Sequence, residues 1–346
     1  MQSRPAGPLC CGRCAGAQAA ARVARRQRFR AAVFAKPGGR LSVPHTMVGA
    51  GRGAGDAAPF RTVTGTLLDI SPHILVVATD AGERRLALTP RSAAWRGRPV
   101  AATELRPDEP VVIRLAPGRR DVADKIWASI GRVAGTISAS DDSQLLVDEG
   151  TTRKRQAVVI APAAANRIRV RFPQLEPGNL IDVIGLRRAG ALEARIPGTS
   201  QPAYPVDRVP APAMVAGHVP STISGSATWH EPVEEPGGLL GVSYPAIDPE
   251  AGCAEDPVGS RSAPRFARMP YLAIGSLLLI RNDCTGDSCL LPVTGCAAIA
   301  RLFNDRCVTC GTSPRGRVAD LTQASFIALG GELERACFNA TITIGG

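Results

Sequence analysis

The sequence predicts a mostly β protein made of three compact units: two small β-barrels in tandem and a third β-barrel at the carboxyl end. The 346 residues include 36 Gly and 29 Pro but only 4% aromatic residues. This composition favours short strands joined by turns over a helical bundle. From Phe60 onward, short apolar segments alternate with polar turns, and the stretch that begins at Val63 recurs from Val133.

The repeat predicts a first barrel over residues 60–128 and a second over residues 129–196. Its anchors are Val63, Gly65, Thr66, Leu105, Pro107, Val111 and Ile113, which recur at a constant offset as Val133, Gly135, Thr136, Leu175, Pro177, Ile181 and Val183. Between the anchors we expect the strand pairs Ile74–Thr79 with Arg84–Leu88, and Gln144–Val147 with Gln156–Ile160. The order of strands and turns resembles that of oligonucleotide/oligosaccharide-binding (OB) barrels.

The two segments outside the barrels differ in character. Residues 1–59 are a basic extension without periodicity, which we interpret as disordered. Nine Arg, one Lys and one Asp give the stretch from Met1 to Phe60 a charge of +9 out of the total of +11, so the rest is nearly neutral and we expect no nucleic-acid partner. Residues 197–224 are rich in proline and predict a linker.

No segment predicts membrane insertion or export. The longest apolar run, Tyr271–Ile280, is far shorter than the roughly 18 residues that a transmembrane helix needs. No signal peptide is visible either, because no apolar core follows the basic stretch.

Residues 225–346 form the third unit, which contains most of the chemistry. The expected elements, in order, are a β-prone opening at Gly225–Trp229, a strand at Leu272–Ile280, a turn at Cys284–Cys289, a strand at Ala297–Phe303, a short helix that ends at Gly330 and a strand at Cys337–Ile344. Either Asp320 or Thr322 could cap the helix.

Four short segments follow one another in a characteristic order: Gly225–Trp229, Leu272–Ser276, Asn304–Arg306 and Asp320–Thr322. In this order they resemble the rare lipoprotein A family, a group of double-psi β-barrel proteins related to expansins and barwin-like proteins. The resemblance covers the last third of the chain. It implies a six-stranded double-psi β-barrel at residues 225–346 that acts on, or binds, peptidoglycan.

The resemblance also implies the site residues. Asp305 falls on the acidic residue that lines the groove of lytic members, where glycan cleavage needs a positioned acid. Asp305 could equally make turn hydrogen bonds and pair with Arg306. The substrate-binding candidates are Trp229, His230, Asn304, Arg306 and Asp320. Trp229 could instead belong to the core, His230 could be an ordinary surface residue and Asp320 could be the helix cap.

The cysteines of the third unit allow two chemistries. They are Cys253, Cys284, Cys289, Cys296, Cys307, Cys310 and Cys337. Cys284 and Cys289 form a C-x4-C pair, and Cys307 and Cys310 form a C-x2-C pair, both of which are spacings that zinc sites use. The resemblance implies disulfides instead. The turn between Cys284 and Cys289 could bring the two sulfurs together across a hairpin. We expect disulfides, with neither a metal nor a cofactor, and therefore an extracytoplasmic or cell-wall-associated protein.

Three functions are consistent with these observations. The first is a cell-envelope protein that binds peptidoglycan or a related glycan through the third barrel. The second is an enzyme, a peptidoglycan lytic transglycosylase with Asp305 as its acid. The third is a disulfide-stapled protein-binding or inhibitor module whose partner is an envelope protein. A groove with carboxylates and an aromatic side chain would favour a glycan, and an apolar, shallow surface would favour a protein.

Overall fold

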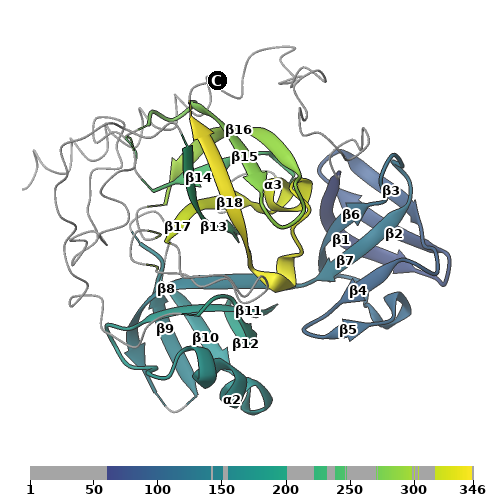
Figure 1. Ribbon diagram of the computed structural model, residues 1–346. Helices are drawn as coiled ribbons and strands as arrows, with labels where there is room; N and C mark the ends of the chain where they lie inside the picture. Colours follow the sequence, from purple (N-terminus) through teal and green to yellow (C-terminus); the bar gives the residue numbers. More distant parts are fainter. Residues whose placement is uncertain are drawn as a thin grey trace, which may run out of the picture.

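The computed structural model describes most of the chain after residue 60. The described residues are 61–141, 143–150, 155–200, 222–231, 238–245, 247, 270, 272–297, 300, 303 and 316–344. Figure 1 shows three β-rich units, with the first in purple and blue, the second in teal and the third in green and yellow. The predicted mostly β character is confirmed.

The first unit is a seven-stranded sheet with the order β3-β2-β1-β6-β7-β4-β5. Its elements are β1 (Thr62–Ile70), β2 (Ile74–Thr79), β3 (Gly82–Ala87), β4 (Ala93–Trp95), β5 (Pro99–Val100), the 3₁₀ turn η1 (Ala102–Glu104), β6 (Pro110–Leu115) and β7 (Ala123–Ala128). The expected closed barrel is therefore corrected. Because β4 pairs with β7 in parallel, β3 meets the start of β7 only through the bridge between Ala87 and Val122.

The second unit is a closed five-stranded barrel with the order β10-β12-β11-β8-β9. Its elements are β8 (Ile130–Ser140), β9 (Gln144–Asp148), β10 (Gln156–Ile160), α2 (Pro162–Arg171), β11 (Leu180–Arg188) and β12 (Ala191–Pro197). The parallel pairing of β10 with β12 closes the barrel. The sequence analysis did not predict α2, which starts at Pro162 and buries Ala164 and Ile168 in the barrel core.

The two units are copies of one another at the level of strand register. Gly65 pairs with Val111 across β1 and β6, and Gly135 pairs with Ile181 across β8 and β11, so both partners are displaced along the chain by the offset of the repeat. The pairings of β1 with β2 and of β8 with β9 also match, including a β-bulge at the same position. The repeat therefore corresponds to a real structural duplication.

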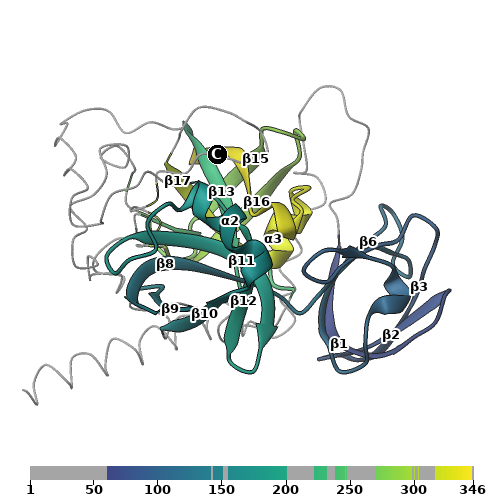
Figure 2. The ribbon, with the colours of Figure 1, turned by 90° about the horizontal axis from the view of Figure 1, so that it is seen from below.

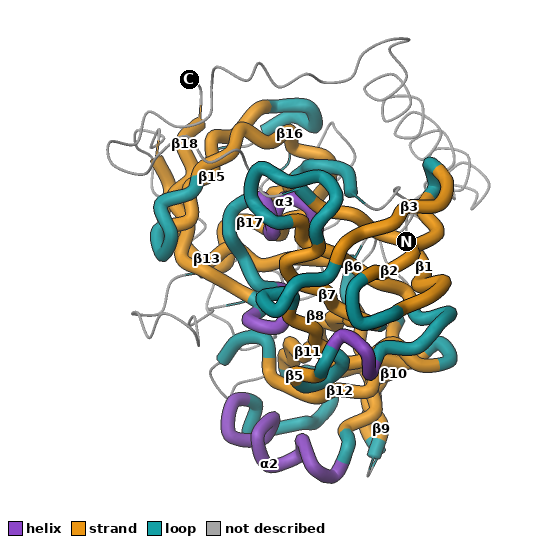
Figure 3. The backbone as a smooth tube through the Cα atoms, turned by 90° about the vertical axis from the view of Figure 1, so that its right-hand side faces the viewer, coloured by secondary structure: helices purple, strands orange, loops and turns teal. Residues whose placement is uncertain are grey.

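The third unit is a closed six-stranded barrel with the order β13-β17-β14-β16-β15-β18. Its elements are β13 (Thr222–His230), β14 (Val242–Tyr244), β15 (Leu277–Asn282), β16 (Ser288–Cys296), β17 (Arg317–Thr322), α3 (Gln323–Ala328), η6 (Leu333–Arg335) and β18 (Cys337–Ile344). Two strand pairs are parallel, β13 with β17 and β14 with β16, and the other neighbours are antiparallel. In Figure 3 this barrel and α3 lie above the second unit, and α2 lies at the bottom.

One local prediction for the third unit is decided and another needs correction. Of the two expected caps of α3, the structure has Thr322, whose hydroxyl accepts a hydrogen bond from the Ser325 amide. The expected strand at 297–303 is replaced, at its described residues, by successive hydrogen bonds between residues three apart, which form a turn-like structure. The end of the helix region at Gly330, with φ of +75°, and the last strand at Cys337–Ile344 are as predicted.

The three units share a buried interface. A single cluster of buried apolar side chains includes Trp95 and Trp127 from the first unit, Ile184 and Leu186 from the second, and the core of the third barrel. Only Ser129 separates β7 from β8, and β8 runs beneath the third barrel in Figure 1. Figure 2 shows the first unit to one side of the other two. The first two units are therefore packed against the third.

Two further observations concern the connections. The predicted linker at 197–224 begins at the last residue of β12 and ends inside β13, and its middle lies outside the described residues. Within the described part of the chain, no helix has the length and apolar character needed to cross a membrane.

The duplication predicts that Gly65 and Gly135 respond alike to substitution. A β-carbon would lie 2.0 Å from a backbone oxygen at Gly65 and 2.2 Å from one at Gly135, so the strands would have to separate. We expect Gly65→Ala and Gly135→Ala each to lower the free energy of unfolding by about 1–3 kcal/mol in urea titrations. Val170→Ala, at an exposed position of α2, is the control and should change it by less than about 0.5 kcal/mol. An effect at only one glycine would contradict the equivalence.

Candidate functional site

The candidate site lies where β13 and β17 run side by side between the second and third units. Thr228 pairs with Asp320, and His230 pairs with Thr322, in a parallel register. Thr228 and His230 point to the same side because alternate residues of a strand share a face. The site is therefore built on the wall of the third barrel that faces the second.

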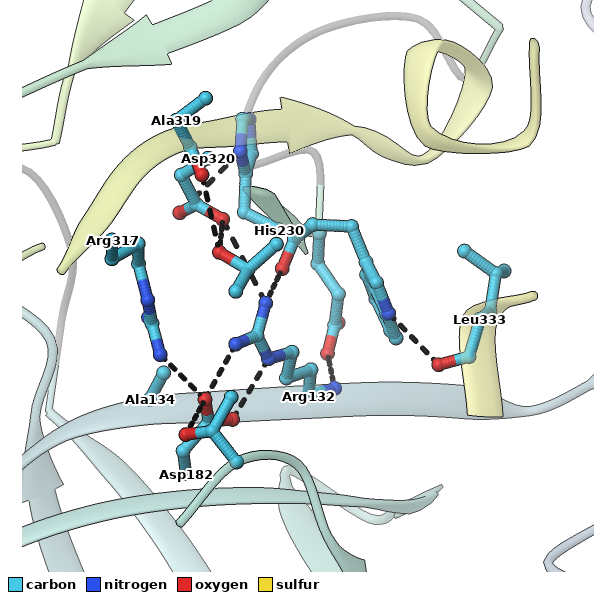
Figure 4. A network of polar contacts seen from close by, with 12 residues as sticks. Arg132, Ala134, Asp182, His230, Arg317, Ala319, Asp320 and Leu333 are labelled. Atoms are coloured by element: carbon cyan, nitrogen blue, oxygen red, sulfur yellow. Dashed lines mark hydrogen bonds and ion pairs between the residues drawn. The ribbon is translucent and has the colours of Figure 1, made fainter. Parts of the chain in front are cut away.

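A β-bulge turns two charged residues of β17 toward this side. Ser226 pairs with Arg317 and Ala227 pairs with Ala319, so the register skips one residue. A bulge re-aims the side chains that follow it. Arg317 and Asp320, three positions apart, therefore both point toward the second barrel (Figure 4).

Asp320 is at the centre of the polar cluster. Its Oδ1 accepts a hydrogen bond from the Thr228 hydroxyl at 2.9 Å. Its Oδ2 lies 3.6 Å from Nδ1 of His230, and its Oδ1 lies 3.7 Å from Nη1 of Arg132. The side chain of Asp320 is 20% exposed and that of His230 is 11% exposed. A carboxylate and an imidazole thus face one another at a site that solvent still reaches.

Arg132, on β8 of the second barrel, is held on three sides. Its Nε and Nη2 donate to the two carboxylate oxygens of Asp182 at 2.8 and 2.5 Å. Its Nη1 donates to the backbone carbonyl of Trp229, the residue before His230. The guanidinium also lies 5.9 Å from the centre of the Trp229 ring. These contacts fix the guanidinium in one orientation.

Asp182, on β11, is completely buried between two guanidiniums. In addition to Arg132, Nη2 of Arg317 donates to it at 2.6 Å and the Thr199 hydroxyl donates at 3.0 Å. Burial by itself would raise the pKa of the Asp182 carboxyl. The charges of Arg132 and Arg317 outweigh burial, and the hydrogen bonds from Arg132 and Thr199 add to their effect, so the pKa lies below its usual range.

Arg132 and Arg317 share Asp182, and Arg132 lies beside a second carboxylate as well. The Asp182 carboxylate lies 2.5 Å from Nη2 of Arg132 and 2.6 Å from Nη2 of Arg317. Buried charges need partners of opposite sign. Asp320, 3.7 Å from Nη1 of Arg132, places a further carboxylate at this guanidinium.

A second contact between the barrels lies next to the site. The Glu231 carboxylate, directly after His230, accepts hydrogen bonds of 2.8 to 3.0 Å from the Arg187 guanidinium of β11. Glu231 also accepts a 2.6 Å hydrogen bond from the Arg132 amide. The segment that contains His230 is therefore fixed by the second barrel on both sides.

The first unit reaches the same segment from another direction. Trp127 donates its indole N–H to Glu334 at 2.6 Å, and the Lys125 ammonium pairs with both Glu334 and Glu332. These glutamates flank Leu333 in η6, whose carbonyl accepts the indole N–H of Trp229 at 2.8 Å. Both tandem units thus support the end of β13.

The structure brings together two of the predicted substrate-binding residues, His230 and Asp320. Trp229 is corrected from a sugar-stacking residue to a core residue, because it is only 1% exposed and its indole N–H is hydrogen-bonded inside the protein. The other predicted site residues, Asn304, Asp305 and Arg306, lie outside the described residues.

The expected cysteine bridge across the hairpin is also corrected. Cys284 and Cys289 are both free, because Cys284 lies in the exposed turn whereas Cys289 points into the core opposite Ile280. Burial raises the pKa of the Cys289 thiol. Cys296 is disulfide-bonded, and Cys337 is buried at the start of β18. The remaining candidates lie outside the described residues: Cys253, Cys307 and Cys310.

The sequence analysis missed Arg132 and Asp182. One signal was available, because Asp182 is the only charged residue in the apolar run Leu180–Leu186. The repeat offered another signal, since Thr62 and Val112 take the places of Arg132 and Asp182 in the first copy. A charged pair in only one of two copies marks a copy-specific contact.

The chain matches no protein-family model and no curated protein. Over the part of the chain that the structure describes, no group of three or more His, Cys, Asp or Glu side chains is placed to hold a metal ion.

Asp182→Asn tests the buried cluster. An amide between two guanidiniums leaves their charges uncompensated, so we expect the free energy of unfolding at pH 7 to fall by about 3–5 kcal/mol. Because the folded-state pKa of Asp182 is lowered, the carboxylate stabilises the fold above about pH 4, and this contribution is lost as the pH falls through the folded pKa. The difference between wild type and variant should therefore shrink at acid pH.

Urea titrations followed by tryptophan fluorescence between about pH 7 and pH 2 measure this difference. The exposed Asp80→Asn is the matched control and should leave the pH dependence as in the wild type. A difference between wild type and Asp182→Asn that stays constant over the whole range would contradict the assignment.

Proposed function

We propose that this protein is a cell-envelope protein that binds peptidoglycan or a related wall glycan through its third barrel. The observation that carries the proposal is the partly exposed pair of Asp320 and His230, fixed at the junction of β13 and β17. Glycan hydroxyls hydrogen-bond to carboxylates and imidazoles, and bonds to an ionised group are the stronger ones. A few fixed polar groups of this kind orient a ligand.

The barrel topologies support the fold types on which this proposal draws. We take the third barrel to be a double-psi β-barrel, because two parallel strand pairs lie within a closed six-stranded barrel. We take the second to be OB-like, because its third and fifth strands close the barrel in parallel and α2 lies between its third and fourth strands.

Cleavage would need a further group. A lytic enzyme needs a protonated acid near the glycosidic oxygen. Lytic transglycosylase activity with Asp305 as the acid is the alternative, and the binding experiment below tests it as well.

An extracytoplasmic location follows from the same proposal. The disulfide at Cys296 supports an oxidising compartment, where such bonds form and persist. This is the compartment in which a protein would meet cell-wall glycan.

Binding to another envelope protein is the second candidate. Leu277 and Leu279, two positions apart on β15, are 53% and 39% exposed. Exposed apolar side chains that adjoin one another favour a protein partner over a sugar. In that case the Asp320 cluster would serve only to join the barrels.

Asp320→Asn tests the glycan proposal in the full chain. Loss of a charged hydrogen-bond acceptor should weaken binding to purified peptidoglycan about tenfold or more. Asp283→Asn is the matched control, because Asp283 accepts a hydrogen bond from the Thr341 hydroxyl at 3.0 Å on the same barrel, much as Asp320 does from Thr228. Co-sedimentation with insoluble peptidoglycan over a range of protein concentrations measures both.

The same samples separate the alternatives. Release of anhydro-sugar products by the wild type but not by Asp305→Asn would establish the lytic function in place of simple binding. Failure of the wild type to bind or to release products would refute the glycan proposal. Equal binding by the wild type and Asp320→Asn would move the glycan site away from Asp320.

A further inference from the structure

We infer that Arg132, a residue of the second barrel, is a positioning residue for the candidate site of the third barrel. Anchored by Asp182, its guanidinium holds the Asp320 carboxylate and the backbone before His230 in a fixed relation. This inference rests on the proposed function for its meaning in glycan binding, although its geometry can be tested without a glycan. It gives the second barrel a direct role in the site.

Asp182 anchors the guanidinium of Arg132. Two nitrogens of Arg132 donate to the two oxygens of Asp182, a fork-to-fork geometry that only an arginine can make. Arg317, from the third barrel, donates to the same carboxylate. Asp182 therefore joins the barrels and at the same time directs Arg132 (Figure 4).

The third nitrogen of the Arg132 guanidinium, Nη1, contacts the third barrel. Nη1 of Arg132 donates to the carbonyl of Trp229 and lies 3.7 Å from Oδ1 of Asp320. Trp229 directly precedes His230. One nitrogen thus sets both the backbone from which the imidazole projects and the carboxylate that faces the imidazole at 3.6 Å.

Only one copy of the repeat has the charged pair of Arg132 and Asp182. In the first unit, Thr62 and Val112 take the equivalent register positions on β1 and β6. Among the described residues, the ion pairs from that unit to third-unit carboxylates come from Lys125 on β7. The charged pair is therefore specific to the copy that faces Asp320.

Stability alone gives no reason for this arrangement. Well-packed apolar side chains in place of a buried ion pair are often neutral or stabilising. Joining two barrels therefore does not require a buried Asp182 between Arg132 and Arg317. A guanidinium fixed beside a partly exposed carboxylate does, however, help to hold that carboxylate in one orientation.

Arg132→Lys in the full chain is the direct test. Lysine keeps the positive charge, but its compact ammonium lacks the planar fork by which Arg132 reaches both oxygens of Asp182 and the Trp229 carbonyl at once. Arg114→Lys is the matched control, because Arg114 pairs with Asp124 at 2.6 Å and its guanidinium lies 5.9 Å from the Trp127 ring. That geometry parallels the contacts of Arg132 with Asp182 and with Trp229.

The first readout needs no glycan. The ¹⁵N-imidazole spectrum at one fixed pH contains four histidines, and its His230 signal is identified by its loss in His230→Gln. We expect this signal in Arg132→Lys to move from its wild-type position toward its position in Asp320→Asn. In Arg114→Lys it should stay at the wild-type position. A His230 signal that is unmoved in folded Arg132→Lys would overturn the inference.

A milder variant covers the case in which Arg132→Lys does not fold. Thr199→Val removes one hydrogen bond to the Asp182 carboxylate without changing any charge. It loosens the anchor of Arg132 and should move the His230 signal in the same direction by a smaller amount. An unmoved signal in Thr199→Val, with Arg132→Lys unfolded, would also overturn the inference.

The second readout is the affinity for a soluble peptidoglycan tetrasaccharide. Arg132→Lys should weaken binding about fivefold or more, and this loss should disappear in the Asp320→Asn background because the two residues act as a unit. Additive losses would overturn the inference. If Asp320→Asn binds like the wild type, the proposed function fails at this site, and the imidazole spectrum still decides the role of Arg132.

Discussion

The arrangement of the molecule depends on one buried carboxylate. Asp182 lies with no exposed surface between Arg132 of its own barrel and Arg317 of the next. Removing either partner by mutation would leave an uncompensated charge in the interior, which is strongly unfavourable. Gly198 is a necessary part of the arrangement, because a β-carbon there would lie 2.3 Å from Oδ1 of Asp182.

The tandem units act on the third barrel through different contacts that converge on one short segment. The second unit holds the end of β13 through Arg132 and Arg187. The first unit holds η6 through Lys125 and Trp127, and η6 in turn accepts the indole N–H of Trp229. The duplicated unit thus provides two supports, one mainly polar and one that also uses a tryptophan. This explains why the repeat keeps its strand register while its charged residues differ.

Sequence patterns predicted the local elements better than the contacts between units. The strand at Gln156–Ile160 and the end of the helix region at Gly330 were predictable, since alternation and turn chemistry are local signals. The helix α2 was not, because its Arg-rich sequence has only two buried residues. The first unit is an open sheet in which β4 pairs with β7, and this strand is too short to be recognised from the sequence. Arg132 and Asp182 meet Arg317 only in three dimensions, across 135 residues of sequence between Asp182 and Arg317.

The central claim is that Asp182 makes the second and third barrels one cooperative unit. Hydrogen exchange of the full chain tests it most directly. In the wild type, the slowest-exchanging backbone amides should have the same opening free energy in all four strands at the junction, which are β8 and β11 of the second barrel and β13 and β17 of the third. In Asp182→Asn the account predicts faster exchange in all four strands together, with the first unit changed less. Faster exchange in β8 and β11 while β13 and β17 keep wild-type protection would contradict it.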